Sequence, residues 1–313
     1  MPQTIQAPTD SVAAPWFASL PPRLKPWAQL MRLDRPIGAW LLFWPCVFGL
    51  VLGAIADERN FTDWRDFFYV ILFGIGTLVM RGAGCAFNDI IDRDFDAAVA
   101  RTRGRPIPSG AITPRHAALF TAALCLIGLV ILLQFNWFTV ALGAASLLLV
   151  AAYPFMKRIT WWPQAWLGLT FNWGALLGFA AQTGRLDIAD GFLYAGLVFW
   201  TLGYDTIYAH QDKEDDALIG VKSTARLFGA RTRPALSAFY GLAVVLIGLA
   251  LAFCGAGFPA WIGLAVFAVH LVWQIWRLEI GDPALCLRIF KSNRDAGLLL
   301  FAGLLADAVM RAA

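Results

Sequence analysis

Long apolar segments recur along almost the whole chain, and they restrict its fold more than any other feature of the sequence. A helix needs about 20 mostly apolar residues to cross a bilayer, and nine stretches come near this length. Because a backbone in lipid must satisfy its hydrogen bonds internally, we predict an all-α fold, a polytopic membrane bundle of about nine transmembrane helices. The predicted spans are residues 37–56, 67–87, 117–135, 138–156, 163–182, 190–209, 234–254, 259–276 and 295–311.

The composition agrees with a membrane protein. Hydrophobic residues make up 59% of the 313 residues and charged residues only 15%, whereas a soluble domain carries about 25% charged residues. The net charge of +4 comes with no long basic run and no alternation of basic and aromatic residues, so we expect no nucleic-acid partner. The five cysteines lie far apart without a Cys-x-x-Cys pair, which argues against a zinc site and a disulfide framework.

The Lys and Arg residues indicate how these spans are oriented, because cytoplasmic loops carry an excess of both. If the N-terminus is cytoplasmic, 21 of the 25 Lys and Arg lie on that side and 4 on the other. The first 20 residues are polar and Pro-rich and fit neither a secretory signal nor an Arg-rich transit peptide. We predict a flexible tail over residues 1–25, a transmembrane domain over residues 26–313 and a cytoplasmic N-terminus.

Two acidic stretches end the second and the sixth predicted span, on the same side of the membrane, and hold 9 of the 21 Asp and Glu. Helical spacing aligns Asn88, Asp92 and Asp96 on one face, and Asp205, Tyr208, Asp212 and Asp216 on another. Carboxylates beside a bilayer are costly without compensation. Mg²⁺ takes oxygen ligands, commonly one or two carboxylates together with substrate phosphates. The two faces therefore predict a magnesium site that binds a phosphorylated substrate.

An alternative is that these acids are solvated or neutralise nearby arginines, and for Asp94 and Asp215 both interpretations stay open. Cationic and hydroxyl side chains near the stretches would stabilise a diphosphate leaving group. The positive-inside rule would also place Lys and Arg on this side without any catalytic role. Both interpretations apply to Arg35, Arg105, Lys157 and Lys222, and Tyr153 is the hydroxyl side chain, one helical turn before Lys157.

Arg81 is different because it lies inside the second predicted span, seven residues before Asn88 and on nearly the same helix face. An Arg at that depth is costly and usually faces a polar cavity, so we predict that it binds the anionic group of a second substrate. The alternative is that its long side chain reaches the membrane interface. Elsewhere, Gln164 and Asn172 are expected to form hydrogen bonds between helices, and Gly49-x-x-x-Gly53 to permit close helix packing.

Both acidic stretches match sequence motifs of one family. Residues 88–96 resemble the Asn-Asp-x-x-Asp-x-x-x-Asp motif of the UbiA superfamily of intramembrane prenyltransferases, and residues 205–216 resemble its Asp-x-x-Tyr-Ala-x-x-Asp-x-x-x-Asp motif. Residues 32–45, 103–110 and 220–224 are similar to the bacterial branch that prenylates 4-hydroxybenzoate. The resemblance covers nearly the whole chain after about residue 25.

The resemblance implies nine spans around a central cavity and transfer of a polyprenyl group from polyprenyl diphosphate to the ring carbon ortho to the hydroxyl of 4-hydroxybenzoate, in ubiquinone biosynthesis. It implies Mg²⁺ bound by Asn88, Asp92, Asp96, Asp205, Asp212 and Asp216. It places Arg35, Arg105, Tyr153, Lys157, Tyr208 and Lys222 near the diphosphate and Arg81 near the carboxylate of the aromatic acid. Asp92, Asp212, Arg81 and Tyr208 are the residues expected to carry catalysis. The expected location is a bacterial inner (plasma) membrane, with the active site facing the cytoplasm.

Two alternatives from different classes stay open. The first is a superfamily enzyme with another acceptor, such as haem, homogentisate, a naphthoate or a sugar phosphate. Arg81 and residues 220–224 favour the hydroxybenzoate branch over these. The second is a cation transporter, which should place polar groups along the depth of the membrane. The acids of this chain instead gather at one side.

Overall fold

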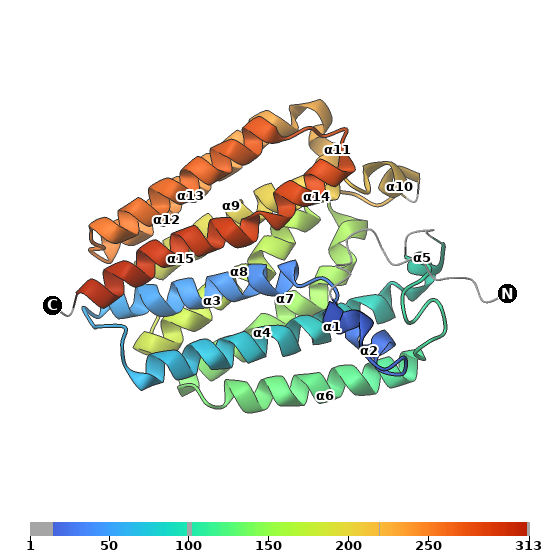
Figure 1. Ribbon diagram of the computed structural model, residues 1–313, viewed down its shortest axis with the longest axis horizontal. Coiled ribbons are helices and arrows are strands. Elements are labelled where there is room, and N and C mark those ends of the chain that lie inside the picture. The colour runs from blue at the N-terminus through green and yellow to red at the C-terminus, as the bar shows by residue number, and fades with distance from the viewer. Residues whose placement is uncertain (1–14, 99–101, 219, 312–313) are drawn as a thin grey trace. The chain divides into compact units, whose positions relative to one another are not determined.

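The computed structural model describes residues 15–98, 102–218 and 220–311, which form helices joined by turns and contain no strand (Figure 1). This confirms the predicted all-α class. The long helices are α3 (Ile37–Ala56), α4 (Trp64–Ile91), α6 (Pro114–Leu132), α7 (Trp137–Ile159), α8 (Pro163–Thr183), α9 (Ile188–Ala209), α12 (Thr232–Phe253), α13 (Phe258–Arg277) and α15 (Asn293–Met310). The short ones are α1 (Pro15–Ala18), α2 (Lys25–Leu30), α5 (Arg93–Ala98), α10 (Lys213–Leu218), α11 (Thr224–Phe228), η1 (Gly229–Arg231) and α14 (Pro283–Lys291).

The long helices coincide with the predicted spans, but the count of nine crossings is not confirmed. In the described part of the chain, 6 helices are long and apolar enough to cross a membrane, namely α3, α4, α6, α7, α13 and the continuous segment Thr224–Phe253. α15 has a suitable length but is not among these six, because its 18 residues include the charged Arg294, Asp295 and Asp307. The membrane class therefore rests on the apolar helices. The central cavity and the boundary between tail and domain at residue 25 stay predictions.

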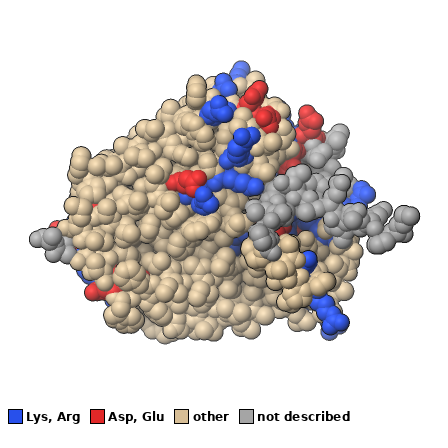
Figure 2. Space-filling model, in the orientation of Figure 1, with Lys and Arg blue, Asp and Glu red and all other residues tan. Residues whose placement is uncertain are grey.

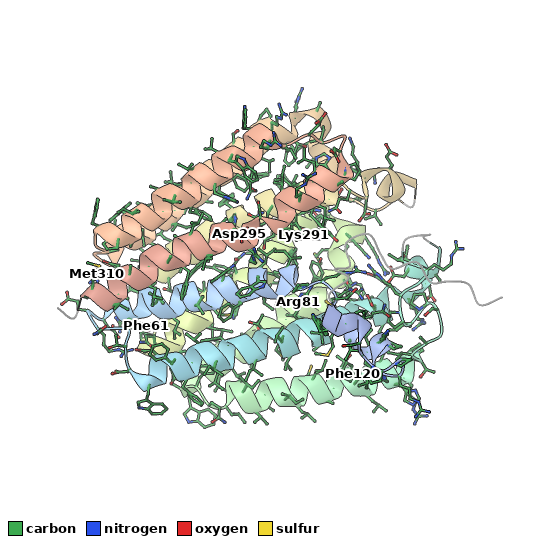
Figure 3. All side chains as sticks on the ribbon, in the orientation of Figure 1. Phe61, Arg81, Phe120, Lys291, Asp295 and Met310 are labelled. Carbon is green, nitrogen blue, oxygen red and sulfur yellow. The ribbon has the colours of Figure 1, made fainter. Side chains whose placement is uncertain are left out.

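The chain divides into two compact units, and α3 and α4 each cross the boundary between them. Unit 1 comprises residues 1–39 and 75–132, and unit 2 comprises residues 40–74 and 133–313. In unit 1, α2 and the turns before α6 pack on the C-terminal part of α4, and the rings of Trp27 and Phe120 lie 4.9 Å apart (Figure 3). The buried residues of this core are Leu30, Ala86, Ile107, Ile112 and Ala117. This core fixes the end of α4 that leads into the first acidic stretch.

Close helix contacts in unit 2 depend on glycines. A Cβ on Gly178 of α8 would lie 2.7 Å from the backbone nitrogen of Leu50 in α3. The predicted close approach at Gly53 is confirmed, because a Cβ there would lie 2.9 Å from the Cβ of Gln182. Small residues let helix backbones approach in membranes, where van der Waals packing drives association. α3 and α8 are therefore packed backbone to backbone.

Buried polar side chains join the helices of unit 2, as the sequence predicts. The Asn172 amide in α8 donates to the Thr201 hydroxyl of α9 at 2.7 Å. The Gln164 carbonyl oxygen accepts from the backbone N–H of Thr224 at 3.0 Å, which fixes the start of α11 against α8. Both bonds connect polar groups of different helices in a buried interior.

We expect Gly178→Ala to lower the thermal unfolding temperature in detergent by several degrees. The added methyl group would meet backbone atoms of Cys46 and Leu50, which cannot rotate away, and such overpacking costs about 1–3 kcal/mol. Gly241→Ala is the matched control, because a Cβ at that position in α12 meets no heavy atom within 4 Å. A Gly178→Ala protein as stable as the Gly241→Ala protein would contradict this packing.

Candidate active site

The first acidic stretch keeps its helical register across a small break. α4 ends at Ile91 and α5 begins at Arg93. The backbone N–H of Asp92 donates to the Asn88 carbonyl at 2.9 Å, and that of Asp96 donates to the Asp92 carbonyl at 2.8 Å. The Asn88 amide also donates to the Asp92 carboxylate at 3.1 Å. The predicted alignment of Asn88, Asp92 and Asp96 therefore holds, and Asp92 and Asp96 are both buried.

Asp89 is the anchor of this stretch within unit 1. Its carboxylate is fully buried, and its two oxygens accept hydrogen bonds from Arg32 Nη2 at 2.6 and 2.9 Å. Burial alone would lower the pKa of Arg32, but pairing with Asp89 raises that pKa above its usual value. Arg32 has a φ of 57°, in the left-handed region that residues with a Cβ rarely adopt. The ion pair therefore holds an unfavourable turn in place before α3.

Arg105 fastens the turns that follow the stretch. Its Nη1 lies 2.7 Å from the Asp96 carboxylate and 3.4 Å from Asp89. The Thr102 hydroxyl donates to the Asp96 carbonyl at 2.9 Å. Burial raises the pKa of Asp96, and Arg105 opposes that rise. Arg105 is thus positioned beside the predicted magnesium ligands, in contact with one of them.

The Arg81 guanidinium lies inside unit 1, where it donates to the carbonyls of Arg32 and Arg35, each at 2.9 Å (Figure 3). A Cβ on Gly38 would lie 2.6 Å from Arg81 Nε, so the glycine makes room for the side chain. Both carbonyls belong to the segment just before α3, so these contacts are compatible with either interpretation of Arg81, and its role toward a substrate stays a prediction. The side chain fixes the backbone that presents Arg35, and its remaining N–H groups are available to an anion.

The second acidic stretch lies at the end of α9 in unit 2, and its helix is interrupted. α9 ends at Ala209, Asp212 lies in the following turn, and α10 begins at Lys213. Asp205 and Tyr208 are half-buried on the last turns of α9. The side chain of Asp216 lies outside the described residues. The predicted single helical face over residues 205–216 is therefore wrong in detail, because the chain turns at His210, whose backbone N–H donates to Ile207 at 3.2 Å.

Two neighbours hold this stretch in unit 2. The His210 Nε2 and the Thr232 hydroxyl lie 2.9 Å apart, and burial lowers the pKa of His210 to about 4. The ring of Tyr208 lies against Phe290 of α14, with centroids 4.5 Å apart. Phe290 belongs to no sequence motif, and its partnership with Tyr208 has no signal in the sequence.

The predicted cations of unit 2 meet at the C-terminal end of α7. The backbone N–H of Lys222 donates to the Lys157 carbonyl at 3.2 Å, and the Lys222 ammonium donates to the Ile159 carbonyl at 3.1 Å. Tyr153 lies one helical turn before Lys157 and is half-buried like it. The structure therefore brings Lys157 and Lys222 together although 65 residues separate them in the sequence.

The comparison with known families decides the class. Residues 42–302 match the UbiA prenyltransferase family. This chain belongs to that family. It is 49% identical to the mitochondrial 4-hydroxybenzoate polyprenyltransferase of Drosophila melanogaster, over 92% of this chain and 72% of that one. It is 47% identical to the enzyme of the same name from Homo sapiens, over 93% and 78% of the two chains.

Solved UbiA structures share the fold. A UbiA homologue from Aeropyrum pernix K1 superposes with a TM-score of 0.71 and 25% identity, over 86% of this chain and 97% of that one. A homologue from Archaeoglobus fulgidus, solved with GPP and Mg²⁺, gives a TM-score of 0.61 at 18% identity, over 91% and 99%. The resemblance to UbiA prenyltransferases and the expected enzyme class are thereby confirmed.

The comparisons also correct the expected location. The similar 4-hydroxybenzoate polyprenyltransferases are mitochondrial proteins of animals. The expectation of a bacterial inner membrane is therefore wrong. It followed from motifs that the bacterial and the mitochondrial UbiA enzymes have in common, and such motifs reflect the reaction more than the compartment.

We expect Asp89→Ala to destabilise this UbiA protein severely, by about 3–5 kcal/mol, because it leaves the buried Arg32 without its partner. Asp94→Ala removes the same group from a side chain that is 84% exposed and pairs with the adjacent Arg93, so little change is expected. Thermal unfolding in detergent measures both. Equal stability of the two variants would rule out Asp89 as the anchor of unit 1.

Proposed function

We propose that this protein transfers a polyprenyl group from polyprenyl diphosphate to the ring carbon ortho to the hydroxyl of 4-hydroxybenzoate, in ubiquinone biosynthesis. The observation that carries the proposal is the high identity, over more than nine tenths of this chain, to enzymes named for this reaction. The paired acidic motifs and their cationic neighbours supply the chemistry that such a transfer needs.

The residues fit magnesium as a cofactor. Asn88, Asp92 and Asp212 offer the hard oxygen ligands that Mg²⁺ prefers. Among the described residues no three His, Cys, Asp or Glu gather into a cluster that could bind a metal alone. Mg²⁺ is commonly bound by one or two carboxylates and completed by substrate phosphate. We assign Asn88, Asp92, Asp96, Asp205, Asp212 and Asp216 as the ligand set; Asp89 is excluded because Arg32 binds both of its oxygens.

The reaction begins when the carbon–oxygen bond between the prenyl group and the diphosphate breaks. Mg²⁺, if held by these residues, would supply positive charge that stabilises the departing diphosphate. Arg35, Arg105 and Lys222 donate N–H groups to the same leaving group. The Tyr153 hydroxyl and the Lys157 ammonium are further donors near it. The bond's electron pair leaves with the diphosphate and the prenyl group becomes an allylic cation. Tyr208, whose ring is positioned by Phe290, faces this charge with π electrons.

The second substrate completes the transfer without a covalent enzyme intermediate. The ring carbon ortho to the hydroxyl donates its electrons to the allylic cation and forms the new carbon–carbon bond. The proton on that carbon then leaves, which restores the aromatic ring. Arg81 binds the carboxylate of 4-hydroxybenzoate through the N–H groups that the carbonyls of Arg32 and Arg35 do not use, and it thereby orients the ring.

We expect Asp92→Asn and Asp212→Asn to reduce turnover by at least about a thousandfold, because each removes a charged metal ligand that is needed in the transition state. Asp94→Asn is the control, since that carboxylate is exposed and outside the ligand set. Product formation from 4-hydroxybenzoate and a long polyprenyl diphosphate is measured by mass spectrometry in proteoliposomes. Near-normal rates for Asp92→Asn or Asp212→Asn would remove the metal-site assignment.

We expect Arg81→Lys to raise the KM for 4-hydroxybenzoate about tenfold or more, because a single ammonium cannot bind two carbonyls and a carboxylate as a guanidinium can. The KM for polyprenyl diphosphate should change far less. An acceptor series containing homogentisate, a naphthoate and a phenol without a carboxylate tests the substrate class directly. Preference for the phenol would overturn the choice of acceptor and leave the prenyltransferase class intact.

A further inference from the structure

α14 is an amphipathic helix at the end of the bundle where the second acidic stretch lies. Its inner face, with Cys286, Ile289 and Phe290, is buried. Its outer face carries Arg288, exposed, and Lys291, half-exposed. α14 packs on α9 and leads directly into α15 (Figure 1). A helix with one apolar face and one basic face is suited to the boundary between water and lipid.

Cations gather around this helix. Arg277 ends α13 and Arg294 lies in the first turn of α15, so these two and the basic residues of α14 lie within 18 residues of sequence. Figure 2 shows Lys and Arg side chains grouped over α14 and the start of α15. Arg294 pairs with Asp295 at 2.7 Å, whereas Arg288 and Lys291 contact no carboxylate among the described residues. Glu279, Asp282 and Asp295 lie in the same stretch, so residues 277–295 carry a net charge of +1. The basic cluster, defined as Arg277, Arg288, Lys291 and Arg294, has its excess positive charge on Arg288 and Lys291.

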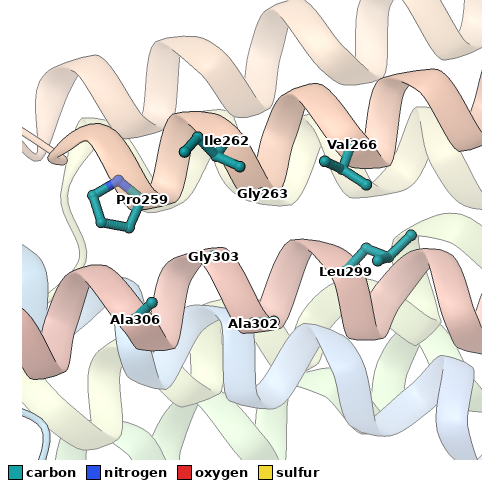
Figure 4. A pocket seen from close by; sticks show the side chains of 8 residues that line it. All are labelled: Pro259, Ile262, Gly263, Val266, Leu299, Ala302, Gly303 and Ala306. Atoms are coloured by element: carbon teal, nitrogen blue, oxygen red, sulfur yellow. The ribbon is translucent and has the colours of Figure 1, made fainter.

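An apolar groove runs along α13 and α15 away from the basic cluster. Every residue that lines it is apolar (Figure 4). The lining residues are Pro259, Ile262, Gly263, Val266, Leu299, Ala302, Gly303 and Ala306. Ile262 is 47% exposed and Val266 is 40% exposed, so the groove is open to the surface. A Cβ on Gly263 would lie 2.8 Å from the Cα of Gly303. The floor of the groove is therefore formed by the backbones of two glycines.

The groove ends at Val266 and Leu299, near the basic cluster along the same helices. Leu299, at one end of the groove, lies five residues after Arg294, which is about 7–8 Å along a helix. His270 follows Val266 by one turn, and its Nε2 lies 3.2 Å from the hydroxyl of Ser292, at the junction of α14 and α15. Trp273 and Trp276 of α13 are 41% and 73% exposed, beside the same end. Exposed Trp is typical of the membrane interface.

We propose that α13, α14 and α15 bind an anionic phospholipid, with its headgroup on Arg288 and Lys291 and an acyl chain in the groove, and that this lipid holds Phe290 against Tyr208. A phospholipid joins an anionic group to an apolar chain in the same order in which cluster and groove follow one another. Its headgroup neutralises cations on the outer face of α14. The inner face of the same nine-residue helix then stays pressed on α9.

The link to the proposed reaction is short. Phe290 contacts the ring of Tyr204 at 5.8 Å and that of Tyr208 at 4.5 Å, and both tyrosines belong to the last turns of α9. Movement of α14 would therefore shift the ring that faces the allylic cation. This part of the proposal rests on the proposed function, whereas lipid binding does not.

Binding is measured by native mass spectrometry after equilibration in micelles with equal amounts of phosphatidylglycerol and phosphatidylcholine. The wild-type protein is expected to retain phosphatidylglycerol preferentially. Arg288→Gln with Lys291→Gln should weaken that retention about 10- to 30-fold, from the attraction of each basic residue for anionic headgroups. The control, Arg115→Gln with Arg231→Gln, removes the same charge from two exposed positions outside α13–α15 and should retain the lipid.

Two further arms separate the parts of the site. Ala302→Phe fills the groove without a change in charge, and it should lower phosphatidylglycerol retention severalfold; unchanged retention would remove the groove from the site. Excess inorganic phosphate should not displace the lipid. Displacement by phosphate would identify a site for free anions and overturn a lipid site.

The coupling is tested by turnover in nanodiscs of phosphatidylcholine alone or with one third phosphatidylglycerol. The wild-type rate should rise severalfold with phosphatidylglycerol, and the Arg288→Gln, Lys291→Gln protein should not respond. If the Arg288→Gln, Lys291→Gln protein retained as much phosphatidylglycerol as the wild type, the lipid site would be overturned. If the wild-type protein retained phosphatidylglycerol but its turnover did not depend on that lipid, only the coupling between lipid and reaction would be overturned. If no acceptor is prenylated in any lipid, the proposed function fails, and the retention experiment still decides the lipid site.

Discussion

The buried ion pair between Arg32 and Asp89 is the interaction on which unit 1 depends. Two charges inside a packed helical core are stable only as a pair with further hydrogen bonds, and Arg105 and the Gln29 carbonyl supply them. The pair stabilises the left-handed turn at Arg32 and ties it to the helix that carries Asn88 and leads into Asp92. Structural rigidity at the end of α4 is therefore obtained with an aspartate, the same residue type that we propose as a metal ligand elsewhere in the stretch.

This arrangement explains why adjacent carboxylates differ in role. Asp89 and Asp92 are separated by one turn, yet Asp89 has its oxygens on Arg32 and Asp92 bonds with the Asn88 amide. The Asp89 carboxylate is contacted by two guanidiniums, those of Arg32 and Arg105, so it gains little from a metal. The exclusion of Asp89 from the proposed ligand set therefore follows from its partners and not from its place in the sequence.

The sequence alone predicts the features that depend on the order of residues close together in the chain. Runs of about 20 apolar residues predict the long helices, and spacing by three or four residues predicts the shared face of Asn88, Asp92 and Asp96. Contacts between distant residues were beyond its reach. Arg32 lies 57 residues from Asp89, and Phe290 meets Tyr208 through the packing of α14 on α9. The break at His210 was also missed. The motif residues on both sides of it keep a spacing of three or four residues, which predicts one uninterrupted helix.

The two acidic stretches are built on opposite principles. In unit 1 the acids lie on one continuous helical register, locked by arginines from sequence segments on either side. In unit 2 the register breaks after Ala209, and Asp212 stands in a turn held by the His210–Thr232 contact and by the aromatic contact of Tyr208 with Phe290. A turn has fewer backbone bonds to lose than a helix, so it can adjust at lower cost. Any adjustment on substrate binding should therefore be concentrated in unit 2, where α14 is the element in contact with the aromatic side of that stretch.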